Sequence, residues 1–236
     1  MDLRRSQGGK SNHPEEADRG TFWRGIAIDV DTRLRVGRAI GKNEEEVAMA
    51  MMQQIKDRCN PIEPPAISSD GKDSYPEAML ETWGKSPEYS GRGRPPTRKL
   101  PQPGWKCLQV TKHRSGSRLI GVTHKVVYGD PEEVPELMGL NTAYVERTNL
   151  TSRQMNGRMV RKTLSFSKEE KMLEASCVLE DSVYNLMRPH KSLRIEIDND
   201  KRRWMSRSPA MAAGLTDHIW TMSELMMTVA VPKSTT

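Results

Sequence analysis

The chain has 236 residues, of which 35% are hydrophobic, and a net charge of +6 at neutral pH. This length suits one sizeable domain, and the positive charge favours a polyanionic partner such as nucleic acid. No apolar run approaches the ~20 residues of a membrane span, and no N-terminal signal pattern is present. The three cysteines are far apart, which argues against disulfides and against a zinc site. We therefore expect a reduced, cytoplasmic protein.

The first half of the chain begins with residues 1–20, which lack hydrophobic periodicity and are expected to form a disordered segment. Two β-rich runs follow, at 22–28 and 34–40, and the turn-prone residues between them predict a β-hairpin. Alternation along the first strand places Arg24 on the opposite face from Trp23.

An amphipathic helix is expected next, because Asn43 precedes a glutamate run and then apolar residues at helical spacing. This helix should end near Arg58. A short apolar run then leads to Asp70, which is followed by Gly71. An acid in this position is expected at the end of a strand, where it faces a crevice. Another short helix is predicted to begin at Tyr75.

The segment 85–103 is rich in proline, glycine and basic residues, which predicts a surface insertion without a core of its own. Within it, Arg92 and Arg94 belong to an Arg-Gly-Arg-Pro-Pro sequence. This sequence resembles the core of AT-hooks, which bind the DNA minor groove, but five residues make a short match and favour a plain flexible loop instead. Two further strands, at 107–112 and 119–128, are predicted to form a second hairpin.

The segment 141–167 contains one carboxylate, Glu146, among amides, hydroxyls and bases. A helix is expected from Thr142 to Asn156, with its end at Gly157. A lone acid in a basic helix is explained if the acid holds a metal ion and the bases hold phosphates. The basic residues that follow Glu146 are Arg147, Arg153, Arg158, Arg161 and Lys162.

Two helices are predicted beyond this segment. Ser167 and Glu170 have the spacing of a capping box, which predicts a helix start at Ser167. The buried face of this helix is expected to consist of Met172, Ala175, Leu179, Val183 and Leu186. A final apolar helix is predicted from Met222 to Val229.

Several motifs occur in the order found in the DDE transposases of small insertion sequences. Ser69-Asp70-Gly71, followed by Tyr-Pro-Glu-Ala at 75–78, resembles the second acidic motif of that family. Tyr-Val-Glu-Arg-Thr-Asn-Leu at 144–150 resembles the third. Three further segments also resemble that family, namely 161–168, 189–194 and 214–218. The resemblance therefore covers residues 21–225.

The resemblance implies an α/β fold with a ribonuclease-H-like mixed sheet flanked by helices. This domain would span 21–231, with 85–103 as a basic insertion and 232–236 as a tail. The family uses three carboxylates to hold a pair of Mg²⁺ or Mn²⁺ ions, which are hard cations that prefer oxygen ligands. Asp70 and Glu146 match the second and third of these acids, so both are expected to be catalytic metal ligands.

The first acid of the family, in an Asp-Glu-x-Trp motif, has no counterpart in this sequence. Asp2 has the right order but no strand-like context, and Asp29, at a turn, is a weak candidate ligand. We therefore expect an N-terminally truncated family member whose first strand is missing or degenerate. Taken without the resemblance, Asp70 before a glycine is also typical of an ordinary turn.

The function implied is that of an insertion-sequence transposase. It would cleave and transfer DNA strands at the element's ends, as a homodimer or higher assembly on double-stranded DNA. The alternatives are a non-catalytic DNA-binding remnant that regulates a full-length transposase, and a repair or recombination nuclease that shares only the fold. The residues expected to contact DNA are Arg147, Asn149, Arg153, Arg158, Arg161, Lys162, Arg92 and Arg94.

Overall fold

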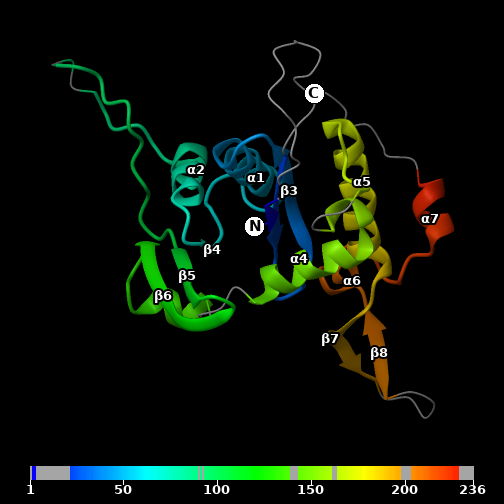
Figure 1. Cartoon of the computed structure of the whole chain (residues 1–236). Helices are drawn as coiled ribbons and strands as arrows, with labels where there is room; N and C mark the ends of the chain where they lie inside the picture. The colour runs from blue at the N-terminus through cyan, green and yellow to red at the C-terminus, as the bar shows by residue number, and fades with distance from the viewer. Residues whose placement is uncertain are drawn as a thin grey trace.

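The computed structural model describes residues 2–3, 22–89, 91, 93–138, 143–160, 164–197 and 203–228. Its described strands form three small sheets, and helices pack beside them, so the fold is mixed α/β (Figure 1). None of the helices in these ranges combines the length and the apolar character needed to cross a membrane.

The first sheet contains β1 (Asp2–Leu3), β2 (Trp23–Ile28) and β3 (Arg35–Gly41) in that spatial order, with antiparallel neighbours. The predicted hairpin of β2 and β3 is therefore confirmed. The rest of the segment 1–20 lies outside the described residues.

The helix α1 (Glu44–Arg58) covers one face of this sheet, and it begins as predicted. The Asn43 side chain accepts a hydrogen bond from the Glu46 backbone N–H at 2.8 Å. Glycine at position 25 lets the helix approach closely, because a Cβ there would lie 2.7 Å from Cγ1 of Val47. The buried side chains of α1 are Val47, Ala48, Met51, Met52 and Ile55.

The second sheet contains β4 (Ile67–Asp70), β5 (Cys107–Ser115) and β6 (Arg118–Tyr128), with β4 parallel and β6 antiparallel to β5. The helix α2 (Ser74–Trp83) packs beside α1. One hydrophobic core joins these helices to both sheets, because Ala39 of β3 and Cys107 of β5 belong to the same buried cluster.

The segment 85–103 projects from this body as an extended arm (Figure 1). Among its described residues, the structure shows one isolated β-bridge, between Lys85 and Leu100. Most of the described side chains of the arm are exposed.

The remaining elements are mainly helical. They begin with α3 (Glu133–Met138), α4 (Ala143–Met155), the 3-10 turn η2 (Gly157–Met159), α5 (Glu170–Ser182) and the π-helical turn η3 (Val183–Met187). A two-stranded sheet and two short helices follow, namely β7 (His190–Glu196), β8 (Trp204–Arg207), α6 (Pro209–Ala212) and α7 (Met222–Met227).

The capping box predicted at Ser167 is wrong, because α5 begins at Glu170 and its N-cap residue, Glu169, makes no side-chain capping bond. The Ser167 hydroxyl is occupied elsewhere, since it accepts a hydrogen bond from Nη1 of Arg158 at 3.0 Å. A complete capping box occurs instead at α7, between Thr221 and Glu224.

The face predicted for α5 is also wrong, since Met172 and Leu179 are each 49% exposed. The face that packs inward contains Leu173 and Cys177 together with two acids, Glu180 and Asp181. These acids are buried because they meet arginines that the first sheet presents to them.

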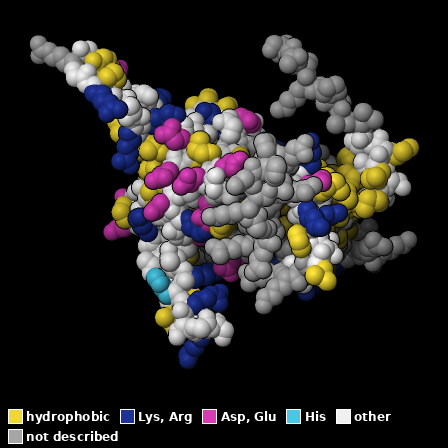
Figure 2. Space-filling model, turned by 45° about the horizontal axis from the view of Figure 1, so that its top comes forward, with side chains coloured by type: hydrophobic (Ala, Val, Ile, Leu, Met, Phe, Trp, Pro, Cys, Tyr) yellow, Lys and Arg dark blue, Asp and Glu magenta, His cyan; other side chains and the backbone are white. Residues whose placement is uncertain are grey.

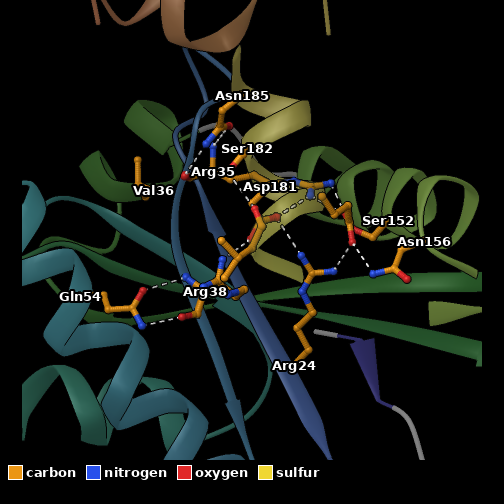
Figure 3. Close-up of polar contacts among 12 residues, drawn as sticks. Arg24, Arg35, Val36, Arg38, Gln54, Ser152, Asn156, Asp181, Ser182 and Asn185 are labelled. Atoms are coloured by element: carbon orange, nitrogen blue, oxygen red, sulfur yellow. Dashed lines mark hydrogen bonds and ion pairs between the residues drawn. The ribbon is translucent and has the colours of Figure 1, made fainter. Parts of the chain in front are cut away.

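The buried arginines are Arg24 of β2 and Arg35 of β3, whose side chains are each 1% exposed. Arg24 contacts Glu180 at 2.9 Å and Asp181 at 2.8 Å, and Arg35 contacts each acid at 2.6 Å. Arg38 adds a third contact to Asp181 at 3.0 Å. Figure 3 shows the three arginines converging with Asp181 between the first sheet and α5. We call this group the buried charge cluster.

We predict that Arg24→Met destabilises the protein by about 3 kcal/mol or more, because it leaves buried carboxylates with fewer partners. Urea unfolding followed by circular dichroism measures this change in the free energy of unfolding. The control is Arg118→Met at the exposed start of β6. It should change that free energy by less than ~0.5 kcal/mol. Equal effects in both variants would contradict a stabilising role for the cluster.

Candidate functional site

Asp70 is the last residue of β4, where it lies in register with Val110 of the parallel strand β5. Val110 packs with Leu108 and with Val134 of α3. Cys107 lies on the opposite face of β5 from Val110, and it belongs to the core formed with α1 and α2. Because strand residues alternate between faces, the register places Asp70 on the face away from α1 and α2.

The surroundings of Asp70 are unusual for an aspartate in a turn. The carboxyl group is partly buried, and its Oδ1 atom is buried without a hydrogen-bond partner among the described residues. Burial raises the pKa of Asp70, and a hydrogen bond from the Lys72 backbone N–H partly offsets the rise. A Cβ at Gly71 would clash with the Thr111 hydroxyl, which explains why glycine follows the acid.

Glu146 lies in the first turn of α4, and its side chain is 53% exposed. Its Oε1 atom accepts a hydrogen bond from Nζ of Lys112 on β5 at 2.5 Å. Lys112 is two residues beyond Val110, so it shares the face of β5 on which the register places Asp70. Both predicted carboxylates therefore lie beside the same face of β5.

The third acid expected from the resemblance is not assembled with these two in the part of the chain that the structure describes. No group of three or more His, Cys, Asp or Glu side chains there is arranged to hold a metal ion. Asp29 is engaged in its own turn, where Oδ2 accepts a hydrogen bond from the Thr32 backbone N–H at 3.0 Å and another from the Thr32 hydroxyl. Asp2 lies on β1, with its backbone in register with Arg24.

The predicted DNA-contacting residues that the structure describes differ in their exposure to solvent. Arg147 and Arg94 are exposed, whereas Arg153 and Arg158 are half-buried. Asn149 is only 6% exposed, so it lies on the inward face of α4. Three other predicted residues lie outside the described part of the chain, namely Arg92, Arg161 and Lys162.

Lys112 is a residue of this site that the sequence did not single out. No local pattern marks it, because its pairing with Glu146 depends on how α4 lies against β5. An acid that faces a strand lysine across such a packing boundary can be recognised only from the tertiary structure.

We predict that Asp70→Asn stabilises the protein at pH 7. The pKa of Asp70 is higher in the folded state than its ordinary value of 3.8, so folding of the wild-type chain becomes less favourable as pH rises through the folded-state pKa. Asparagine does not ionise, so the variant avoids this loss. Urea unfolding at pH 7 and near pH 3 should show an advantage for Asp70→Asn that is larger at pH 7.

The matched control is Asp31→Asn, which removes an exposed acid from the β2–β3 turn. Its free energy of unfolding should differ from that of the wild-type chain by the same small amount at both pH values. An advantage of Asp70→Asn that does not depend on pH would contradict the desolvation of Asp70.

The chain matches no family model, no curated protein and no solved structure.

Proposed function

We propose that this chain is, or descends from, the catalytic domain of a DDE insertion-sequence transposase that cleaves and transfers strands of double-stranded DNA. The observation that carries the proposal is the placement of Asp70 and Glu146 beside one face of β5. These are the two acids that the family motifs select. They are 76 residues apart in the sequence, so their proximity to the same strand is not a local effect.

The order of elements supports a ribonuclease-H-like fold for this domain. The chain runs through β2, β3, α1, β4, α2, β5, β6 and α3 before it reaches α4, the helix with Glu146. Both three-stranded sheets share the core formed with α1 and α2. In addition, β1 pairs with the edge of β2 that β3 leaves open, and it precedes β2 in the chain, as the acid-bearing first strand does in the family that the motifs resemble.

The donor atoms suit Mg²⁺ or Mn²⁺, because Oδ1 of Asp70 is buried with no hydrogen-bond partner among the residues that the structure describes, and Glu146 is accessible. These two residues would hold the metal. When bound, such ions activate a water or a 3′-hydroxyl and stabilise the leaving oxygen of a phosphodiester. Asp70 would contribute an oxygen that is already partly removed from water. Glu146 would have to release its ion pair with Lys112 before it could bind the metal.

A non-catalytic DNA-binding protein is the competing proposal. It is favoured by the absence, among the described residues, of a third acid grouped with Asp70 and Glu146. In that case the chain would bind DNA without cleaving it, whether or not metal ions are present. Assembly into a homodimer or larger complex on paired DNA ends is expected for a transposase, and it is part of the first proposal only.

We predict that the purified chain nicks linear duplexes carrying the DNA that flanks its coding region, in the presence of Mg²⁺ or Mn²⁺. Nicking at 3′ ends should be abolished in Asp70→Asn and in Glu146→Gln, because each variant removes a carboxylate oxygen from the site. Denaturing gel electrophoresis of end-labelled DNA gives the measurement. Glu174→Gln, on the exposed face of α5, serves as the control and should retain the activity.

Two results of this assay separate the alternatives. Nicking that persists in both site variants would refute the assignment of Asp70 and Glu146. Binding of the duplex without nicking, in the wild-type chain and under all metal conditions, would favour the DNA-binding alternative.

We further predict that Lys112→Met tightens the binding of Mn²⁺, because its ammonium group competes for the Glu146 carboxylate. The ion pair is partly exposed, so its removal should improve affinity by up to about fivefold, which corresponds to ~1 kcal/mol. Electron paramagnetic resonance of free Mn²⁺ measures this affinity. Lys125→Met removes an equal charge from β6, where the side chain is 67% exposed, and should have a smaller effect. Weaker binding in Lys112→Met would show that the lysine supports the site.

A further inference from the structure

Three segments that are far apart in the sequence meet around one residue: the start of β3 just after the β2–β3 turn, the helix α4, and η3, which leads into β7. Arg35 joins them. Its backbone N–H donates to Oδ1 of Asn185 at 3.0 Å, and its Nη2 donates to Oγ of Ser152 at 3.0 Å. Its guanidinium carbon also lies 3.9 Å from the ring centroid of Tyr184. The relative positions of the three segments are therefore fixed by a buried side chain.

The β2–β3 turn presents Arg33 toward α4. Arg33 has a φ angle of 62°, and it is the only non-glycine residue with a positive φ in the described backbone. This conformation costs an L-residue roughly 1 kcal/mol. The guanidinium carbon of Arg33 lies 3.5 Å from the ring centroid of Tyr144. Arg147 is three residues further along α4, so it shares that side of the helix.

The η3–β7 junction contributes Arg188 and His190. The His190 ring lies 4.9 Å from the Tyr184 ring in an edge-to-face arrangement, and its Nε2 atom is buried without a partner among the described residues. Burial lowers the pKa of His190 to about 4, with further lowering by the positive charges of Arg188, Arg147, Arg33 and Arg35. The imidazole is therefore neutral at pH 7, and these arginines surround it.

The positive charge of this region is incompletely compensated. Arg35 is neutralised by the buried charge cluster, and Glu146 is paired with Lys112. In the described part of the chain, no carboxylate is within ion-pair distance of Arg33, Arg147 or Arg188. Figure 2 shows acidic and basic side chains interspersed over one face of the molecule.

We propose that Arg33, Arg147 and Arg188 form a binding site for one backbone phosphate of duplex DNA, which we call the arginine site. Guanidinium groups recognise phosphate oxygens through paired hydrogen bonds, and they retain their charge when partly desolvated. Arg147 directly follows Glu146, so a phosphate held here would position the DNA strand relative to the proposed metal ligands. The arginine site therefore rests on, and deepens, the proposed function.

The first test is the salt dependence of binding of a fluorescently labelled 20-base-pair duplex, measured by anisotropy. The double variant Arg147→Gln/Arg188→Gln should bind more weakly, and its log–log salt slope should be less negative by ~0.9, the value for one phosphate. In each single variant, the salt slope should become less negative by no more than this ~0.9. Arg118→Gln, an equal charge change at the exposed start of β6, should leave the slope unchanged.

Two outcomes of this experiment would overturn the arginine site. An unchanged slope in the double variant means that these side chains do not neutralise a DNA phosphate. A slope that becomes less negative by ~1.8 in the double variant means that Arg147 and Arg188 contact separate phosphates rather than one.

The second test uses inorganic phosphate and the same duplex as probes, and it follows the His190 ring signals by NMR in the full chain. An anion in the arginine site offsets the positive charges around His190, so the pKa of His190 should rise. The His113 ring, which is exposed on β5, is the internal control and should not change. A response to inorganic phosphate but not to DNA would overturn the assignment to DNA.

The two proposals can fail separately. If the wild-type chain nicks DNA but the salt slopes do not change, the arginine site is wrong and the proposed function stands. If both probes shift the His190 signals but no metal condition produces nicking, the arginine site stands and the catalytic function is wrong.

Discussion

The buried charge cluster is the interaction on which the rest of the structure depends. Arg24 and Arg35 are removed from water on the first sheet, and Glu180 and Asp181 are removed from water on α5. Isolated charges cannot be buried in this way without a large loss of hydration, so each side requires the other. The cluster therefore determines how α5 is rotated, since turning the helix would expose its acids and leave the arginines without partners.

The same cluster also positions the candidate site. Arg35 bonds to Ser152, so α4 is held with a polar face inward and with Glu146 and Arg147 outward. Arg35 also packs on Tyr184, which contacts His190. The elements proposed to bind metal and phosphate are thus attached to one buried arrangement. A substitution in the cluster is therefore expected to affect both stability and function.

Asp70 illustrates the opposite relation between stability and function. Its carboxyl group is partly buried, and its Oδ1 atom has no hydrogen-bond partner in the described part of the chain. The ionised form is therefore disfavoured in the folded protein, and the pKa of Asp70 is raised. A residue selected for stability alone would be neutral or better paired. Acids whose pKa is raised by burial are enriched at functional sites. The local geometry of Asp70 therefore supports the same residue that the family motifs select, through an independent physical argument.

The sequence by itself determined the elements that depend on local chemistry. The β2–β3 hairpin, the helix capped by Asn43 and the end of α4 before Gly157 follow from residue patterns within a few positions of each element. It also selected Asp70 and Glu146 as site residues, and their metal-binding role stays a prediction. Only the tertiary structure decided the start and the buried face of α5, the pairing of Lys112 with Glu146 and the grouping of Arg33 with Arg147 and Arg188. The physical reason is that charged residues are predicted to face water unless partners are known, and these partners come from distant parts of the chain.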